Sequence, residues 1–158
     1  MTPRRWVCVA ALAAALMLGG CSSFEREWKS AAHRPVAAST AGAERFAGAW
    51  DGQWTSEKHR LPSGAAAGGR LRCLFTPIDE THYRARFHAD WLVFATGYEA
   101  RFTAERRGGV LAFRGEHDLG AIFGGIYRYE GRVTAEQFHA RFASRSDFGR
   151  FEMGRVKR

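Results

Sequence analysis

The chain has 158 residues. A single domain usually takes about 100 to 200 residues, so this length excludes a large multidomain enzyme. A composition of 46% hydrophobic, 13% aromatic and 25% charged residues excludes a disordered chain, which would contain fewer apolar residues. The 18 glycines against 4 prolines favour tight turns over extended linkers, and therefore favour β structure.

The first 20 residues have the pattern of an export signal. Arg4 and Arg5 precede the apolar run 6–18, which is too short to span a bilayer core of about 30 Å. The run ends in Leu18-Gly19-Gly20-Cys21, which resembles the bacterial lipobox. The resemblance implies that residues 1–20 are removed as a lipoprotein signal peptide and that Cys21 is acylated with palmitate-type chains.

Two alternatives exist for this segment. An ordinary buried N-terminal helix could end at a chance cysteine, but no amphipathic helical pattern is expected after Cys21. Twin-arginine export is the second alternative, and the residues after Arg5 depart from that motif. Ser22 stands where an aspartate would resemble an inner-membrane retention signal. The expected location is therefore the bacterial cell envelope, lipid-anchored to the periplasmic face of the outer membrane.

Charge and cysteine content bound the partners of the mature chain. Loss of Arg4 and Arg5 lowers the formal charge from +8 to +6, and a diffuse positive field attracts anionic envelope components such as lipid headgroups. The arginines are spread singly, so we expect a solvated outer face and no nucleic-acid partner. Cys73 would be the one cysteine left unmodified, so no intramolecular disulfide can form. Its alternation with apolar neighbours predicts a core residue.

The mature chain divides into a tether and one folded domain. Residues 21–43 are expected to form a lipidated, flexible tether with a short helical turn around Glu25 to Ala32. Residues 44–158 are expected to fold. Within that domain the low-complexity segment 64–69 is typical of a mobile loop.

From Glu44 onward, apolar and polar residues alternate with period two, the spacing that separates the two faces of a strand. In segment 82–91 the apolar face holds Tyr83, Ala85, Phe87, Ala89 and Trp91, and the polar face holds His82, Arg84, Arg86, His88 and Asp90. Segments 94–105 and 137–145 alternate in the same way. The pattern predicts strands with one face in a core and the other in water.

Turn signals divide the domain into about eight strands, at 48–56, 69–76, 82–91, 94–106, 109–116, 125–133, 137–145 and 148–155. Most joints between them are short enough for hairpins between antiparallel neighbours. Closure of such a set removes exposed sheet edges. The predicted fold is therefore all-β, an antiparallel up-and-down barrel, with a two-sheet β-sandwich as the alternative.

The first strand is similar to a known family at two points. Gly48-Ala49-Trp50 and Gly52-Gln53-Trp54 resemble the Gly-x-Trp opening of the calycin superfamily, the lipocalin-type and avidin-type barrels. In those families the tryptophan closes one barrel end and stacks with an arginine of the last strand. The resemblance implies that Trp50 and Trp54 pack at a barrel end, with Arg150 or Arg155 over the ring.

The sequence contains no recognisable nucleotide or zinc motif, and neither a cofactor nor a metal is predicted. Segment 116–118 places two carboxylates beside His117 at a strand end, but it lacks a second pair of metal ligands. Ser144 and Ser146 lie near Asp147 and His139, but neither serine has the context of a nucleophile elbow. We therefore expect a protein that is not an enzyme.

The inward-facing set is rich in aromatic residues. An eight-stranded barrel can hold side chains only, or one small ligand. Both interiors remain open, and the phenylalanine and tryptophan content favours a packed one. A partly hollow interior, with tyrosine hydroxyls as polar tips, would bind a small apolar or aromatic molecule. The candidate ligand-binding residues are Tyr83, Phe87, Trp91, Tyr98, Phe102, Tyr127, Tyr129 and Phe142.

Two functional hypotheses follow. The leading one is a lipid-anchored periplasmic barrel that binds a small apolar or aromatic ligand or has a structural role in the envelope. The alternative is a protein-binding module, an inhibitor or assembly accessory, that uses a basic rim and the loops Glu57 to Gly68 and Gly120 to Gly124.

Overall fold

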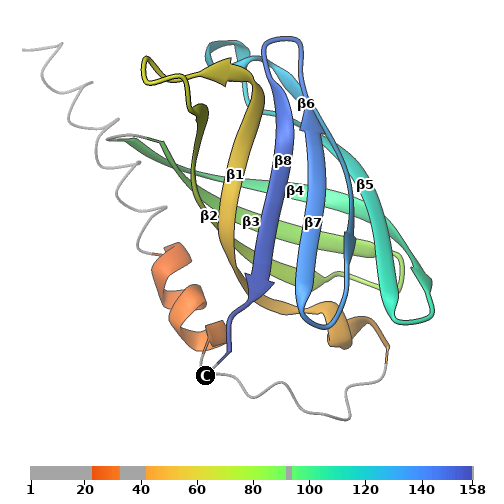
Figure 1. The fold of residues 1–158 in the computed structure, drawn as a ribbon. Coiled ribbons are helices and arrows are strands. Elements are labelled where there is room, and N and C mark those ends of the chain that lie inside the picture. The colour runs from red at the N-terminus through yellow and green to blue at the C-terminus, as the bar shows by residue number, and fades with distance from the viewer. Residues whose placement is uncertain (1–22, 33–41, 92–93, 158) are drawn as a thin grey trace, which may run out of the picture.

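The computed structural model describes residues 23–32, 42–91 and 94–157. The described residues outside the helix 23–32 form two short 3-10 helices and eight strands (Figure 1). In chain order these are η1 (Gly42–Phe46), β1 (Gly48–Arg60), β2 (Ala66–Pro77), β3 (His82–Trp91), β4 (Phe94–Arg107), β5 (Val110–Asp118), η2 (Ala121–Phe123), β6 (Ile126–Val133), β7 (Gln137–Ala143) and β8 (Phe148–Arg155).

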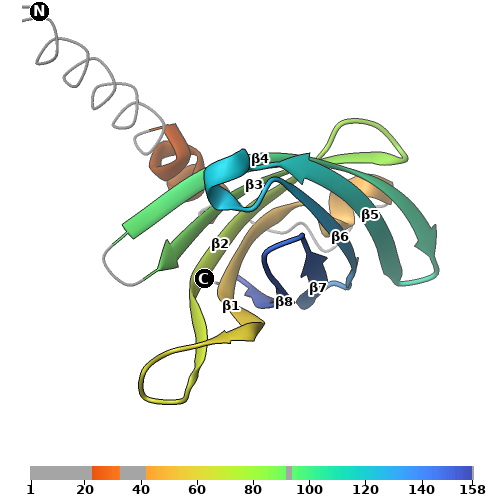
Figure 2. The ribbon, with the colours of Figure 1, turned by 90° about the horizontal axis from the view of Figure 1, so that it is seen from above.

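The strands form a closed antiparallel up-and-down barrel, which confirms the predicted fold and excludes the sandwich. Each strand pairs with the next, and β1 pairs with β8 from Trp50 opposite Arg155 to Ser56 opposite Gly149. The strand labels follow one another around the wall in Figure 2. The sheet closes on itself, although β4 pairs with β5 only from Thr103 to Arg107 and its first half pairs with β3 alone.

The alternation pattern predicted most strand boundaries to within a few residues of those in the structure. β3 and β8 begin and end where the pattern predicts. The largest difference lies between the first two strands, because β1 continues to Arg60 and β2 begins at Ala66 after a register shift. The expected mobile loop at 64–69 is therefore mostly strand, and the loop Glu57 to Gly68 shrinks to the tip 61–65.

The middle of the barrel is filled with aromatic rings. Phe75, Phe87 and Phe102 are each 1% exposed. Phe75 stacks on Tyr83 at 4.8 Å, and Phe102 packs on Phe113 at 4.7 Å between ring centroids. Burial of each such side chain contributes about 1.5 to 3 kcal/mol. Cys73 is fully buried among them, as predicted, and burial raises the pKa of its thiol well above the ordinary value.

One end of the barrel is closed by the chain that enters it. Phe46 of η1 is fully buried, and the Tyr83 hydroxyl donates to Ala43 O at 3.3 Å. The Arg155 guanidinium lies 4.3 Å from the Trp50 ring centroid, and it donates to Ala47 O at 2.6 Å and Arg45 O at 2.9 Å. A third bond from the same guanidinium reaches a carbonyl of the turn between β6 and β7.

The other two residues expected at that barrel end lie elsewhere. Arg150 faces outward on β8, where it pairs with Glu57 and Glu152. Trp54 faces inward towards the opposite end of the barrel, where its Nε1 donates to Asp90 O. Successive inward positions on a strand are about 6 to 7 Å apart along it, so Trp50 and Trp54 cannot occupy the same level.

A helix formed by residues 23–32, the docked helix, lies against the outer wall beside the closed end (Figure 1). The helical turn expected around Glu25 to Ala32 is present, and it interrupts the expected tether. Its apolar face holds Phe24, Trp28, Ala31 and Ala32, which pack with Ala49, Leu74 and Val156. The sequence analysis missed this face, whose members recur at helical spacing.

The docked helix changes the outer face of β2 and β3. His88, expected in water, is 8% exposed, and its ring stacks on Phe24 at 5.3 Å. Arg72 donates to Glu25 at 2.6 Å and lies 5.3 Å from the Phe24 and Trp28 ring centroids. The Arg72 guanidinium also lies 3.4 Å from His88 Nδ1. A polar row of the wall therefore becomes a second, smaller packed interface.

Candidate functional site

The end of the barrel opposite η1 is lined by aromatic residues that solvent reaches. Trp54, Tyr98, His117 and Tyr127 are only partly buried, whereas the inward residues at mid-barrel are at most 5% exposed. Each belongs to the inward alternation of its strand, at the strand end farthest from the closed end. We call these four residues and the deeper Tyr129 the aromatic mouth.

The Tyr98 ring stacks with two other rings, those of Phe87 and His117. It stacks on Phe87 below it at 5.1 Å and an interplanar angle of 29°. The His117 ring stacks on Tyr98 with a centroid distance of 6.0 Å and an interplanar angle of 18°. Burial of the hydroxyl, and then its interaction with Tyr129, raise the pKa of Tyr98 well above the ordinary value. The Tyr98 hydroxyl is therefore a neutral hydrogen-bond donor at any physiological pH.

Tyr129 carries an unpartnered polar atom at the bottom of the mouth. The residue is 3% exposed, and its ring packs between Phe87 and Phe151 at 6.4 and 5.9 Å. Its buried hydroxyl has no hydrogen bond of acceptable geometry within the described part of the chain. Burial raises the pKa of Tyr129, so its hydroxyl also stays protonated. A buried hydroxyl without a partner costs about 1 to 3 kcal/mol.

Trp54 is fixed in the mouth by a backbone contact. Its Nε1 donates to Asp90 O at 3.0 Å, which ties the ring of β1 to the end of β3. The strand between them supplies Gly69, where a Cβ atom would collide with Asp90 O and approach Trp54 Nε1 to 3.1 Å. Glycine at position 69 is therefore required by the close approach of the indole to β3.

The eight candidate ligand residues separate into groups. Tyr98, Tyr127, Tyr129 and Phe142 lie together at the mouth, where Phe142 packs on Tyr127 at 6.0 Å. Phe87 and Phe102 are part of the filled middle, and Tyr83 belongs to the closed end. Trp91 is 49% exposed at the last position of β3, so its expected core position is wrong. The alternation continues there, but the wall that would cover the ring has ended.

His117 is a mouth residue that the sequence analysis did not include among the candidate ligand-binding residues. Its spacing from Phe113 was the available signal, because residues four apart on a strand share a face. The flanking carboxylates turn outward: Glu116 lies 3.7 Å from Arg128, and Asp118 accepts from Gly120 N. The cluster at 116–118 is thus divided between the two faces of β5.

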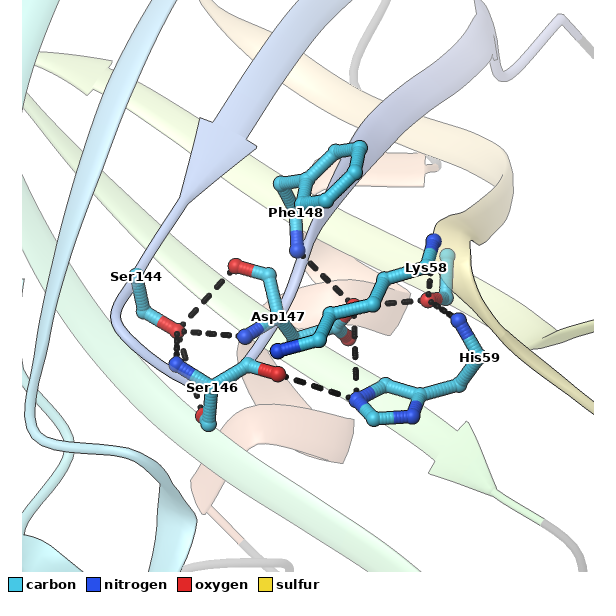
Figure 3. A network of polar contacts seen from close by, with 7 residues as sticks. Lys58, His59, Ser144, Ser146, Asp147 and Phe148 are labelled. Carbon is cyan, nitrogen blue, oxygen red and sulfur yellow. Dashed lines mark hydrogen bonds and ion pairs between the residues drawn. The ribbon is translucent and has the colours of Figure 1, made fainter.

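A polar network at the same end joins β1 to the turn between β7 and β8 (Figure 3). Ser56, which is 1% exposed, donates to Asp147 Oδ1 at 2.6 Å and accepts from His59 N at 2.8 Å. His59 Nε2 lies 3.0 Å from Ser146 O. The serine hydroxyl therefore meets a carboxylate and not an imidazole, which is not the arrangement of an activated nucleophile.

The serines considered in the sequence analysis have structural contacts. Ser144 accepts from the backbone N–H of Ser146 and of Asp147, which closes the turn before β8. His139 lies on the outer face of β7, beside Gln137. The structure therefore does not bring Ser144, Asp147 and His139 into a triad.

The outer wall of β4 to β8 bears two adjoining grooves. One encloses about 700 Å³ and the other about 670 Å³, and they share Thr103, Arg114, Glu130 and Arg141. Arg114 and Arg132 have no ion pair with any described residue, whereas Arg141 pairs with Glu57 at 3.0 Å. The grooves mix both signs of charge with an excess of arginine.

Within the described ranges, no group of three or more His, Cys, Asp or Glu side chains is placed to hold a metal ion. The described helices include none with the length and apolar content needed to cross a bilayer. Comparison of the chain with protein-family models, with curated proteins and with solved structures finds no match.

Proposed function

We propose that this protein is a lipid-anchored envelope protein whose barrel binds a small apolar or aromatic molecule at the aromatic mouth, without catalysing a reaction. The observation that carries the proposal is the contrast between the two ends. The closed end is sealed by Phe46, Tyr83 and the Arg155–Trp50 pair, whereas inward aromatic rings at the mouth remain partly exposed. Convergent rings with a few polar tips are the usual lining of a small-molecule site.

The filled middle limits the depth of the proposed site. Because the rings of Phe75, Phe87 and Phe102 fill the middle of the barrel, a ligand would be confined to the level of Tyr98 and Tyr127. The calycin resemblance supports this assignment, because it implies a tryptophan and an arginine of the last strand at the closed end, and Trp50 and Arg155 pack together there.

The anchor is proposed from the lipobox resemblance alone, since Cys21 and the signal segment 1–20 lie outside the described residues. Acylation would join the lipid to the docked helix, which begins at residue 23 and packs on the barrel wall. We propose the periplasmic face of the outer membrane as the location. In a bacterial host, Cys21→Ser should abolish incorporation of labelled palmitate and release the protein from the membrane fraction. Continued acylation would contradict the anchor.

Photolabelling tests the ligand site on the full chain. Benzophenone, a neutral aromatic photoprobe, should cross-link to peptides that contain Trp54, Tyr98 or Tyr127, and an excess of naphthalene should suppress those cross-links. Tyr127→Ala should reduce labelling at the mouth, whereas Ile78→Ala, an exposed apolar position at the other end of the barrel, should not. Labelling spread evenly over exposed apolar positions would contradict a mouth site.

The outer grooves favour a second candidate function, a protein-binding module. Arg114 and Arg132 are exposed there without carboxylate partners among the described residues, which suits an acidic protein surface. In this case an Arg114→Glu, Arg132→Glu double variant should lose a partner that the wild-type protein captures from envelope extract. Benzophenone labelling of the mouth should be unchanged by the same two substitutions.

A further inference from the structure

The polar chemistry at the bottom of the mouth restricts the kind of ligand, and this inference rests on the proposed function. The hydroxyls of Tyr98 and Tyr129 interact with each other, and the buried Tyr129 hydroxyl has no hydrogen-bond partner of good geometry among the described residues. Both groups are donors that keep their protons. One of the two hydroxyls can donate to the other, which leaves one proton of the pair without an acceptor among the described residues.

The aromatic mouth contains no permanently charged side chain, and its one titratable base is the imidazole of His117, which stacks on Tyr98. Ser56 and His88 are the buried polar residues of the described part, and no permanently charged side chain is buried there. His88 lies on the outer wall beneath the docked helix. Asp147, at the mouth end, already accepts from Ser56 and from Phe148 N. A carboxylate or ammonium group brought to Tyr129 would lose its hydration without gaining an opposite charge.

The surrounding rings favour a flat ligand. Phe87, Tyr98 and His117 form a continuous stack with interplanar angles of 29° and 18°. Tyr127 and Tyr129 form a second stacked pair at 6.3 Å and 23°. Parallel aromatic faces bind planar molecules by offset stacking at low conformational cost.

We propose that the ligand is a neutral, planar aromatic or conjugated molecule with an acceptor oxygen, such as a ketone or quinone carbonyl, which takes the hydrogen bond of Tyr129. The stacked rings of the mouth hold its apolar body, and the Tyr129 hydroxyl fixes its orientation. A planar hydrocarbon would bind to the same rings more weakly, and an ionised analogue would bind more weakly still.

Three probes of nearly one shape test this assignment: fluorene, 9-fluorenone and fluorene-9-carboxylate. Each is titrated against benzophenone photolabelling of the mouth peptides in the full chain. A net hydrogen bond is worth about 0.5 to 1.5 kcal/mol, so fluorenone should compete about 3-fold to 10-fold better than fluorene. The carboxylate should compete at least about tenfold worse than fluorenone.

Tyr129→Phe should erase the preference for fluorenone while leaving fluorene unchanged, because it removes only the hydroxyl. Tyr83→Phe, the same change at the closed end, is the matched control and should keep the preference. Equal competition by fluorene and fluorenone, or a preference that survives Tyr129→Phe, would overturn the assignment. The proposed function would still stand in both cases, because the mouth would still bind fluorene.

A measurement on the wild-type protein covers the case in which Tyr129→Phe does not fold. The carbonyl stretch of bound ¹³C-labelled fluorenone should move to lower frequency than in detergent alone, as it does when a hydroxyl donates to it. An unshifted carbonyl would refute the hydrogen bond. If no probe competes for the mouth peptides, the ligand site itself is refuted.

Discussion

Removal of the Arg155 side chain should destabilise the barrel more than removal of any exposed arginine. Its guanidinium donates to three backbone carbonyls, from the turn between β6 and β7, from Ala47 and from Arg45, and it covers the Trp50 ring at 4.3 Å. Charged hydrogen bonds contribute about 1.5 to 3 kcal/mol each before desolvation of the guanidinium is counted, and the cation–π contact adds about 0.5 to 2 kcal/mol.

Burial opposes part of this gain, as shown by the lowered pKa of Arg155, whose main cause is loss of hydration. We therefore expect Arg155→Met to lower the free energy of unfolding by about 2 to 4 kcal/mol, less than the sum of its contacts. For a domain of this size, that corresponds to a fall in Tm of about 10 to 20 °C. The free energy of unfolding of Arg155→Lys should lie between those of the wild-type protein and Arg155→Met, because one ammonium group cannot donate to three divergent carbonyls.

Thermal unfolding followed by circular dichroism measures this effect, with Arg150→Met as the matched control. Arg150 is five positions away on the same strand but exposed, and its ion pairs with Glu57 and Glu152 are of the kind that contributes about 0 to 1 kcal/mol. Equal losses for Arg155→Met and Arg150→Met would refute the view that the β8 arginine locks the closed end.

Three further outcomes are expected. Phe87→Ala should cost about 3 to 5 kcal/mol in urea unfolding because the ring is 1% exposed, whereas Phe148→Ala, at 44% exposure, should cost under about 1 kcal/mol. Phe24→Ala should release the docked helix, seen as amide exchange of residues 23–32 at least about tenfold faster while exchange in the barrel is unchanged. Hydrogen bonds from Thr81 N and His82 lower the pKa of Asp79 to about 2. The stabilising effect of the Asp79 carboxylate should therefore be complete above about pH 4 and lost as the pH falls through 2. In Asp79→Asn the free energy of unfolding should change less with pH between those values.

The alternation predicted the barrel wall because the pleat of a strand leaves no freedom in which side chain faces which way. Tyr83, Ala85 and Phe87 are all at most 1% exposed, and neighbouring strands pair in the simplest order. Short hairpin joints made consecutive antiparallel pairing the economical topology, and closure followed from the need to pair both edges. These inferences depend on local sequence, which is why they hold to within a few residues.

The docked helix was harder to predict because its partner is the outer face of the barrel. An alternation of period two separates the two faces of a strand, but it does not show that the polar face is exposed to solvent. His88 and Arg72 read as solvated residues, yet Phe24 and Trp28 cover them from a segment about fifty residues away in sequence. Only the helical spacing of the apolar residues in 23–32 indicated that this segment needed a surface to pack against.

The level of a residue along the barrel axis was the second quantity that the sequence could not supply. Tyr83 and Tyr98 both face inward, but one seals the closed end and the other lines the mouth, because their strands run in opposite directions. The same lack of level information placed Trp50 and Trp54 at one end, and left His117 outside the predicted site. The face on which a side chain lies follows from its odd or even position in the strand. Its level along the barrel axis depends on the register of all the strands together.

The position of residues along the barrel axis also explains how one barrel can be packed in its middle and still offer a ligand site at its mouth. Around mid-barrel the inward positions carry Phe75, Phe102 and Phe113, whose rings touch and exclude solvent. Towards the mouth the inward rings of Trp54, Tyr98 and Tyr127 are less completely covered and remain partly exposed. A void beside an aromatic face loses dispersion contacts that a ligand ring can restore. The unpartnered Tyr129 hydroxyl lies directly below these partly exposed rings, and one planar molecule with an acceptor oxygen would satisfy both.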